Sequence, residues 1–242
     1  MSLFRKTTAT PPPAAGTGPA ISLDKVPTGL VNLAKTAAVS LDKQGLTGQR
    51  AAVYLVLDHS GSMTPFYRDG SVQRLAEQAL GLSVNLDDDG RVPLIYFGSH
   101  VNQAEDADLT RYQGVINRTH NSVGWGSTNY AAAIDYVTDL HHGQPLPGLA
   151  IFQSDGEPDS QQYAEDALRE ASTSPLFFAF VGFGNNIRFL ERLDNLRGRA
   201  VDNASFFHAR DPHRVTDAQL YDGITHEYAG WLGAATAKGI VR

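Results

Sequence analysis

Residues 51–63, Ala-Ala-Val-Tyr-Leu-Val-Leu-Asp-His-Ser-Gly-Ser-Met, decide how this chain folds. The first seven of these residues are apolar on both alternating faces, a pattern typical of a central parallel strand that is covered on both sides. A polar loop follows at residues 58–63 and leaves the carboxyl end of this strand. Ligands of doubly wound α/β folds bind at such strand ends, so the same stretch also indicates where a functional site should lie.

Helical and extended patterns alternate along the rest of the chain. Apolar residues at helical spacing predict helices at residues 72–86, 130–140, 161–171, 187–196 and 216–235. Short apolar runs predict strands at residues 92–97, 149–153, 176–181 and 205–209. Strands that alternate with helices predict an α/β fold over residues 49–242, a doubly wound, mostly parallel sheet with helices on both faces.

The sequence before this domain divides into two parts. Residues 1–20 are rich in Pro, Ala, Gly and Thr, which predicts a flexible tail. Residues 21–48 are expected to form a helical extension, because apolar residues recur at helical spacing from Thr28 to Lys43 and Gly45 then ends the helix. A short echo, Ile-Ser-Leu-Asp-Lys at 21–25 and Val-Ser-Leu-Asp-Lys at 39–43, is too short to be a structural repeat.

The composition excludes several classes of function. The 242 residues include 20 Lys and Arg against 26 Asp and Glu, a net charge of −6, whereas a general nucleic-acid binder needs clustered positive charge. Cysteine is absent, which excludes disulfides, thiolate zinc sites, iron–sulfur clusters and cysteine nucleophiles. The sequence contains no signal-peptide pattern and no run of roughly 20 apolar residues. We therefore expect a cytoplasmic protein with no membrane insertion and no nucleic-acid partner.

Three polar loops follow predicted strands or precede predicted helices: residues 58–63, 124–129 and 154–159. In the first loop, a carboxylate and two hydroxyls at alternate positions can turn their oxygens toward one point, and Gly61 relieves the strain of the tight curl. With one hydroxyl and one carboxylate from the other loops, the candidate metal site consists of Asp58, Ser60, Ser62, Thr128 and Asp155. Such oxygen donors suit Mg²⁺ with water completing six-coordination, and Mn²⁺ or Ca²⁺ are the alternatives. Two carboxylates only balance a divalent cation, so an open position would attract a carboxylate from outside the chain.

The same loops also have simpler interpretations. Their Asp and Ser residues are good helix caps, and Thr128 suits the N-cap of the helix that follows it. Glu157 and Asp159 either tune the charge at the metal or, in the interpretation that we prefer, favour the positive N-terminus of the next helix. His59, at the variable position of the first loop, either lines a partner surface or faces solvent. Trp125 is either a partner-binding anchor or an ordinary packing residue.

Taken together and in order, the loop motifs resemble the von Willebrand factor A (vWA) domain and its metal-ion-dependent adhesion site. The motifs are Asp-x-Ser-x-Ser after a buried strand, Gly-Ser-Thr at 126–128 and Asp-Gly at 155–156. The resemblance covers residues 49–242 and implies that the five site residues hold a divalent metal, directly or through water. It also implies that an Asp or Glu of a partner protein takes the vacant coordination position. The Ser-Leu-Asp-Lys echoes resemble a bacterial branch associated with tellurite resistance and chemical stress.

The loops and this resemblance together imply a divalent-metal-dependent protein-binding module, not an enzyme, and the resemblance implies a role in a cytoplasmic tellurite or chemical-stress response. Two alternatives stay open. A metal-assisted phosphohydrolase would need a base beside the metal, for which His59 and His100 are the candidates. A metal-free scaffold would use the acidic loops merely as helix caps.

Overall fold

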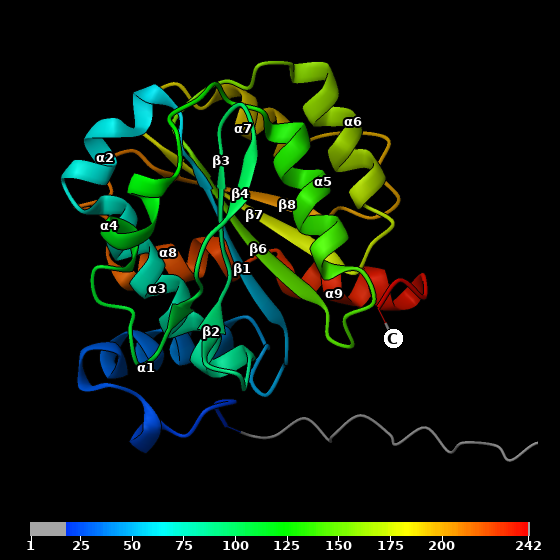
Figure 1. Cartoon of the computed structure of the whole chain (residues 1–242). Coiled ribbons are helices and arrows are strands. Elements are labelled where there is room, and N and C mark those ends of the chain that lie inside the picture. The colour runs from blue at the N-terminus through cyan, green and yellow to red at the C-terminus, as the bar shows by residue number, and fades with distance from the viewer. Residues whose placement is uncertain (1–17, 242) are drawn as a thin grey trace, which may run out of the picture.

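A six-stranded sheet forms the centre of the molecule, whose computed structural model describes residues 18–241 (Figure 1). Residues 1–17 of the predicted tail lie outside the described residues. The strands run in the order β4-β3-β1-β6-β7-β8. In that order their bounds are Val101–Gln103, Leu94–Phe97, Ala52–Asp58, Gly148–Ser154, Leu176–Phe183 and Ala204–Ala209. All pairings are parallel except that of β3 with β4, which confirms the predicted, mostly parallel sheet.

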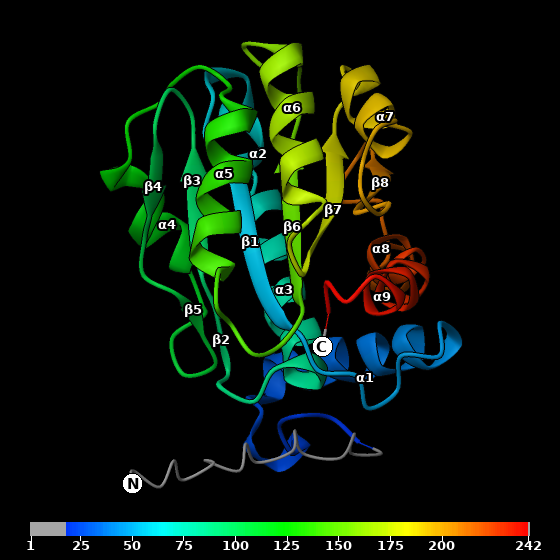
Figure 2. The same ribbon diagram turned by 90° about the vertical axis from the view of Figure 1, so that its right-hand side faces the viewer.

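Helices cover both faces of the sheet (Figures 1 and 2). One layer consists of α5 (Tyr130–His141), α6 (Gln161–Ala171) and α7 (Arg188–Asp194). The other layer includes α3 (Ser71–Leu86), α8 (Asp217–Thr225) and α9 (Tyr228–Ala237), and α1 (Thr28–Lys43) packs against α3 and α8. Successive residues of β1 alternate between the two cores, because Val53 and Leu55 join the cluster with α3 whereas Tyr54 and Val56 join the cluster with α5. The doubly covered strand expected from residues 51–57 is therefore confirmed.

The N-terminal helix α1 packs into the same core as the sheet. Its apolar stripe is buried against α3 and α8 and consists of Leu30, Ala34, Ala37 and Leu41. The close approach of α1 to α3 requires Gly81, because a Cβ atom at that position would lie 2.6 Å from the Cβ of Leu33. The bounds of α1 confirm the helix predicted for residues 28–43.

The predicted strand at residues 92–97 is wrong in its length. Pro93 has no backbone N–H to donate to a ladder, and the chain changes partner at this residue. Before it, β2 (Arg91–Val92) pairs antiparallel with β5 (Ala107–Asp108); after it, β3 joins the main sheet. The three-residue β4 was not predicted, since its Val-Asn-Gln sequence carries too little alternation to be recognised.

The single helix predicted at residues 216–235 is also wrong, because the chain breaks between α8 and α9 at His226 and Glu227. The break allows the two helices to bury different aromatic residues. In α8, the Tyr221 hydroxyl donates to the Gln78 carbonyl of α3 over 3.0 Å, whereas in α9 Tyr228 and Trp231 pack against Phe177 of β7. Tertiary packing thus overrides an otherwise continuous helical pattern.

The remaining elements are short. The helices α2 (Thr64–Arg68) and α4 (Val115–Thr119) have five residues each, and 3₁₀ turns occur at Leu23–Lys25, Gly61–Met63 and His120–Ser122. Within residues 18–241, no helix combines the length and the apolar character that a membrane crossing requires.

Candidate metal centre

The first and third predicted loops meet because the strands that precede them are parallel neighbours. Leu57 of β1 pairs in register with Gln153 of β6, so Asp58 and Ser154 end adjacent strands at the same edge of the sheet. Asp155 follows directly, and the first loop turns through Gly61–Met63 before α2 begins. The carboxyl ends of β1 and β6 therefore present their polar loops side by side, as expected for this fold class.

A continuous series of hydrogen bonds links four of the five predicted site residues. The Ser60 and Ser62 hydroxyl oxygens lie 3.1 Å apart, and the Ser62 hydroxyl donates to Oδ1 of Asp155 over 2.8 Å. Oδ1 of Asp58 accepts the backbone N–H of Ser60 over 2.8 Å. The structure thus brings two carboxylates and two hydroxyls from separate loops into one cluster of oxygen atoms.

The fifth predicted residue, Thr128, lies on a loop that is hydrogen-bonded through its backbone to the first loop. Gly126 forms a parallel bridge with Ser60, and its N–H donates to the His59 carbonyl over 3.1 Å. A side chain at Gly126 would collide with the neighbouring chain, since a Cβ there would lie 2.4 Å from the backbone nitrogen of Ser99. The N-cap interpretation of Thr128 is wrong: Asn129 caps α5, and its side chain accepts the N–H of Ala132 over 3.1 Å.

Asp159 holds the Thr128 loop in place, a role that the sequence did not indicate. Its carboxylate accepts the Thr128 N–H over 3.0 Å and the Ser127 hydroxyl over 2.6 Å. The helix α6 is capped instead by Ser160, whose hydroxyl accepts the Tyr163 N–H over 3.3 Å. The hydrogen-bond partners of Asp159 therefore lie on the Thr128 loop, whereas its electrostatic effect on the N-terminus of α6 stays a prediction.

Asp58 is oriented by two further residues that sequence reasoning missed. The Ser154 hydroxyl donates to Oδ2 of Asp58 over 2.5 Å, and the Tyr67 hydroxyl donates to the Asp58 carbonyl oxygen over 2.9 Å. Ser154 stands directly before Asp155 at the end of a strand, and this placement was the available signal for a positioning role. Tyr67 carried no such signal, because it reaches Asp58 from the following helix.

The electrostatics of the cluster fit a divalent cation. Asp58 has no exposed surface, and this burial raises its pKa to about 6 against the opposing effect of the hydrogen bonds from Ser154 and Ser60. Burial also raises the pKa of Asp155, which the Ser62 hydrogen bond opposes. Within residues 18–241, neither carboxylate forms an ion pair with a Lys, Arg or His side chain. A buried carboxylate and a half-buried one without a cationic partner are costly, and a bound cation would reduce that cost.

The donor set is also chemically suited to a hard metal ion, since every side-chain donor is an oxygen. No three His, Cys, Asp or Glu side chains of residues 18–241 come together in a metal-binding arrangement. The two carboxylates of this site would therefore need the serine and threonine hydroxyls, and water, to complete a coordination sphere.

The two predicted partner-binding residues stack on each other. The rings of His59 and Trp125 lie 3.8 Å apart at an interplanar angle of 7°, and Tyr67 meets Trp125 edge-on at 5.3 Å. His59 is buried, with Nδ1 3.3 Å from the Gly124 carbonyl and Nε2 3.4 Å from Nδ1 of His120, and burial lowers its pKa. The alternative of a solvent-facing His59 is therefore wrong. Trp125 keeps 45% of its surface exposed, directly beside the site.

Comparisons with known proteins agree with this architecture. The vWA-TerF-like family model, described as the vWA domain found in the TerF C terminus, matches residues 50–241. The uncharacterized protein YcbR of Bacillus subtilis (strain 168) is 31% identical over 218 residues, which cover 86% of this chain and 88% of YcbR.

Two solved structures share the fold at low sequence identity. Manganese-loaded TRAP protein from Plasmodium vivax matches with a TM-score of 0.51 and 17% identity, over 75% of this chain and 74% of TRAP. Proximal thread matrix protein 1 from the mussel byssus matches with a TM-score of 0.50 and 12% identity, over 73% of this chain. This chain spans 47% of the mussel protein, about half of its length. The family match and the YcbR relationship together show that the chain belongs to the vWA-TerF-like family.

Proposed function

We propose that this chain is a divalent-metal-dependent protein-binding module. The observation that carries the proposal is the linked oxygen cluster, in which the backbone N–H of Ser60 and the hydroxyls of Ser60 and Ser62 connect two carboxylates that form no ion pair among the described residues. The residues that would hold the metal are Asp58, Ser60, Ser62, Thr128 and Asp155. Membership of the vWA family supports a binding role, because vWA domains are typically protein-interaction modules.

We propose Mg²⁺ as the resident ion, with Mn²⁺ and Ca²⁺ as alternatives of the same hard, oxygen-preferring chemistry. The manganese-loaded structure of TRAP supports a divalent ion in this fold. A bound divalent cation would supply a positive centre that attracts a carboxylate. The two site carboxylates only neutralise its charge, so the partner would present an Asp or Glu side chain. Trp125 would contact the partner beside the metal, and the buried His59 ring would support Trp125 from below.

A binding role suits the histidines better than the alternative role in hydrolysis. A phosphohydrolase needs a positioned base next to the metal. Both ring nitrogens of His59 already face other groups, the Gly124 carbonyl and His120. The family match further supports our proposal that the module serves a cytoplasmic response to tellurite or related chemical stress.

Calorimetric titration of the full chain with Mn²⁺ and Mg²⁺ tests the proposal. Asp155→Asn removes one of the two charges but keeps the side-chain shape, and it should weaken Mn²⁺ binding by roughly 100-fold because charged contacts dominate such sites. Asp166→Asn, an equal charge change at an exposed position on α6, should leave Mn²⁺ binding unchanged. Equal Mn²⁺ affinity of the wild type and Asp155→Asn would contradict the proposed metal site.

Partner binding needs its own measurement, with the full chain immobilised in Mg²⁺ or in a chelator. A partner should be retained in Mg²⁺ and released by the chelator, and Asp155→Asn should fail to retain it. A partner retained equally under both conditions would contradict metal-dependent binding.

A further inference from the structure

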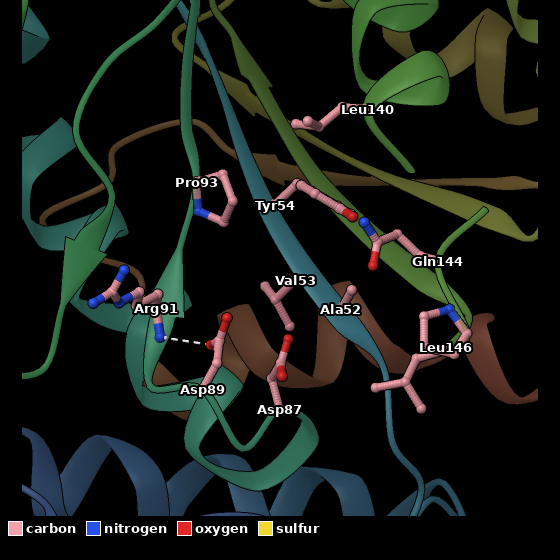
Figure 3. Close-up of a pocket in the computed structure, with 11 residues that line it drawn as sticks. Ala52, Val53, Tyr54, Asp87, Asp89, Arg91, Pro93, Leu140, Gln144 and Leu146 are labelled. Atoms are coloured by element: carbon pink, nitrogen blue, oxygen red, sulfur yellow. Dashed lines mark hydrogen bonds between the residues drawn. The ribbon is translucent and has the colours of Figure 1, made fainter. Parts of the chain in front are cut away.

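A cavity lies at the opposite end of β1 from the candidate metal centre. It has a volume of about 240 Å³ and is bordered by the start of β1, the segment after α3 and the segment after α5 (Figure 3). At a rise of about 3.3 Å per strand residue, Tyr54, the cavity residue of β1 nearest to Asp58, lies roughly 13 Å from it along the strand. The cavity therefore shares no residue with the metal centre.

Two carboxylates give the cavity its charge. Asp87 and Asp89 follow the carboxyl end of α3, where the helix dipole adds further negative potential. The guanidinium of Arg91 does not neutralise them, because its Nε pairs with Asp108 over 3.3 Å, and only the Arg91 backbone N–H reaches Asp89, over 2.8 Å. Within residues 18–241 neither Asp87 nor Asp89 forms an ion pair. Burial and the charge of Asp89 raise the pKa of Asp87 to about 6.

The Tyr54 hydroxyl oxygen adds a hydrogen-bond acceptor to the cavity lining. It is free to accept because the hydroxyl proton is directed to the buried His141. Nε2 of His141 lies 3.1 Å from the Pro175 carbonyl, which can only accept, so Nε2 carries the proton and Nδ1 is left as an acceptor. The Tyr54 hydroxyl, 3.0 Å from Nδ1, must then donate to it. Its oxygen lone pairs stay available on a side chain that is 5% exposed and lines the cavity.

Apolar side chains form the rest of the wall. Pro93, Leu140 and Leu146 line the cavity, and Figure 3 shows Leu140 across the cavity from the two carboxylates. The Gln144 amide, which can donate or accept, completes the polar lining beside Tyr54. The cavity is larger than an engineered apolar cavity of roughly 150 Å³ that accepts benzene, so one ring with a short side arm would fit.

We propose that this cavity binds a compact organic cation, namely a primary ammonium group carried on a short hydrocarbon or aromatic group. The ammonium has N–H donors and no acceptor, which matches the carboxylate acceptors of Asp87 and Asp89. The hydrocarbon part packs against Pro93, Leu140 and Leu146. An anion is disfavoured by the carboxylates, and a hydrated inorganic ion gains nothing from the apolar walls.

Calorimetric titration with phenethylamine tests this assignment on the full chain. We expect saturable binding, and we expect 2-phenylethanol, with a hydroxyl in place of the ammonium, to bind at least about tenfold more weakly, because it lacks the charge-assisted hydrogen bonds. Asp87→Asn should weaken phenethylamine by a similar factor. The matched control Asp88→Asn changes the same charge at an exposed neighbour that does not line the cavity, and it should bind as the wild type does.

Three results would overturn the proposal. They are the absence of saturable phenethylamine binding to the folded wild type, equal binding of the alcohol, and equal weakening by Asp88→Asn and Asp87→Asn. Binding should also persist in a chelator and in Asp155→Asn, because the two sites are separate. Loss of phenethylamine binding under either condition would place the ligand at the metal centre and overturn the assignment to this cavity, whereas the metal proposal is tested by Mn²⁺ affinity alone.

Discussion

The two ends of β1 each hold a pair of carboxylates, but the pairs have different surroundings. At the carboxyl end, the Ser60 backbone N–H and two serine hydroxyls link Asp58 with Asp155. At the amino end, Asp87 and Asp89 line a cavity together with hydrocarbon side chains. Hydroxyl oxygens can coordinate a hard metal ion, whereas hydrocarbon beside a carboxylate suits an organic cation. The number of negative charges alone therefore does not determine what each end binds.

The difference arises from how each end is built. Adjacent parallel strands β1 and β6 end at the same edge, and each continues into a short polar loop, so the carboxyl end collects many small oxygen-bearing side chains. At the amino end, the α3 helix terminates next to the start of β1, and the ends of α3 and α5 contribute larger, partly apolar side chains. The first arrangement gathers oxygen atoms around one point, and the second leaves a cavity.

The largest expected effect is a double dissociation between the two carboxylate pairs. Asp58→Asn removes a unit charge that would lie next to a divalent ion, a loss of several kcal/mol at an effective dielectric of about 20. It should therefore abolish measurable Mn²⁺ binding and leave phenethylamine binding unchanged. Asp87→Asn should do the reverse, and calorimetry on both variants measures all four combinations.

Asp58→Asn is chosen because it preserves the shape and the acceptor for the Ser60 N–H. Thermal unfolding of both variants, measured under the same conditions as that of the wild type, checks that each variant is folded. If either substitution weakened both ligands equally, the two ends would not be independent sites and the comparison would fail.

Most of the fold could be predicted because apolar periodicity is a local property of the sequence. The predicted helix at residues 161–171 agrees with α6, and the apolar run at 51–57 indicated a strand with two covered faces. The errors occur where tertiary contacts decide. Pro93 changes the pairing partner of the chain, and the α8–α9 break lets Tyr221 and Trp231 pack in different places.

The sequence predicted those site residues that lie within one short motif. It did not predict the residues that hold the site in place through hydrogen bonds from distant parts of the chain. The first loop lies within residues 58–63, and its spacing shows that its oxygens can converge. Ser154 reaches Asp58 across 96 positions of sequence, and Asp159 reaches Thr128 across 31. Tyr54 appeared to be an ordinary core residue of an apolar run, because its contact with His141 spans 87 positions. Spacing arguments carry no information about such contacts.

The second prediction concerns α1, the helix next to the amino end of β1. Figures 1 and 2 place α1 at the end of the molecule where β1 begins. The Leu30 side chain of α1 is fully buried in the hydrophobic core. Leu30→Ala should therefore lower the free energy of unfolding by about 2–5 kcal/mol. Urea unfolding followed by tryptophan fluorescence measures this loss.

Lys35→Ala, at an exposed position of the same helix, should change the free energy of unfolding by less than about 0.5 kcal/mol. Folded Leu30→Ala should still bind Mn²⁺ as the wild type does, because α1 lies far from the carboxyl end. If folded Leu30→Ala bound Mn²⁺ more weakly than the wild type, packing at the amino end of β1 would influence the loops at its carboxyl end. The two regions would then not be independent.

The smallest expected effect concerns Ser154, which touches the proposed metal ligand Asp58 but is not itself a proposed ligand. Removing the hydroxyl by Ser154→Ala frees Oδ2 of Asp58 to rotate, and residues that orient metal ligands in this way typically contribute 10–100-fold to metal affinity. Mn²⁺ affinity should therefore fall by roughly tenfold, less than in Asp58→Asn, because both carboxylates remain. The matched control is Ser205→Ala, since Ser205 is also a buried strand serine but its hydroxyl has no hydrogen-bond partner among the described residues. If Ser205→Ala weakened Mn²⁺ as much as Ser154→Ala, the effect would reflect general loosening of the sheet. If Ser154→Ala bound Mn²⁺ as tightly as the wild type, the hydroxyls of the first loop would suffice to orient Asp58, and the third loop would contribute only Asp155.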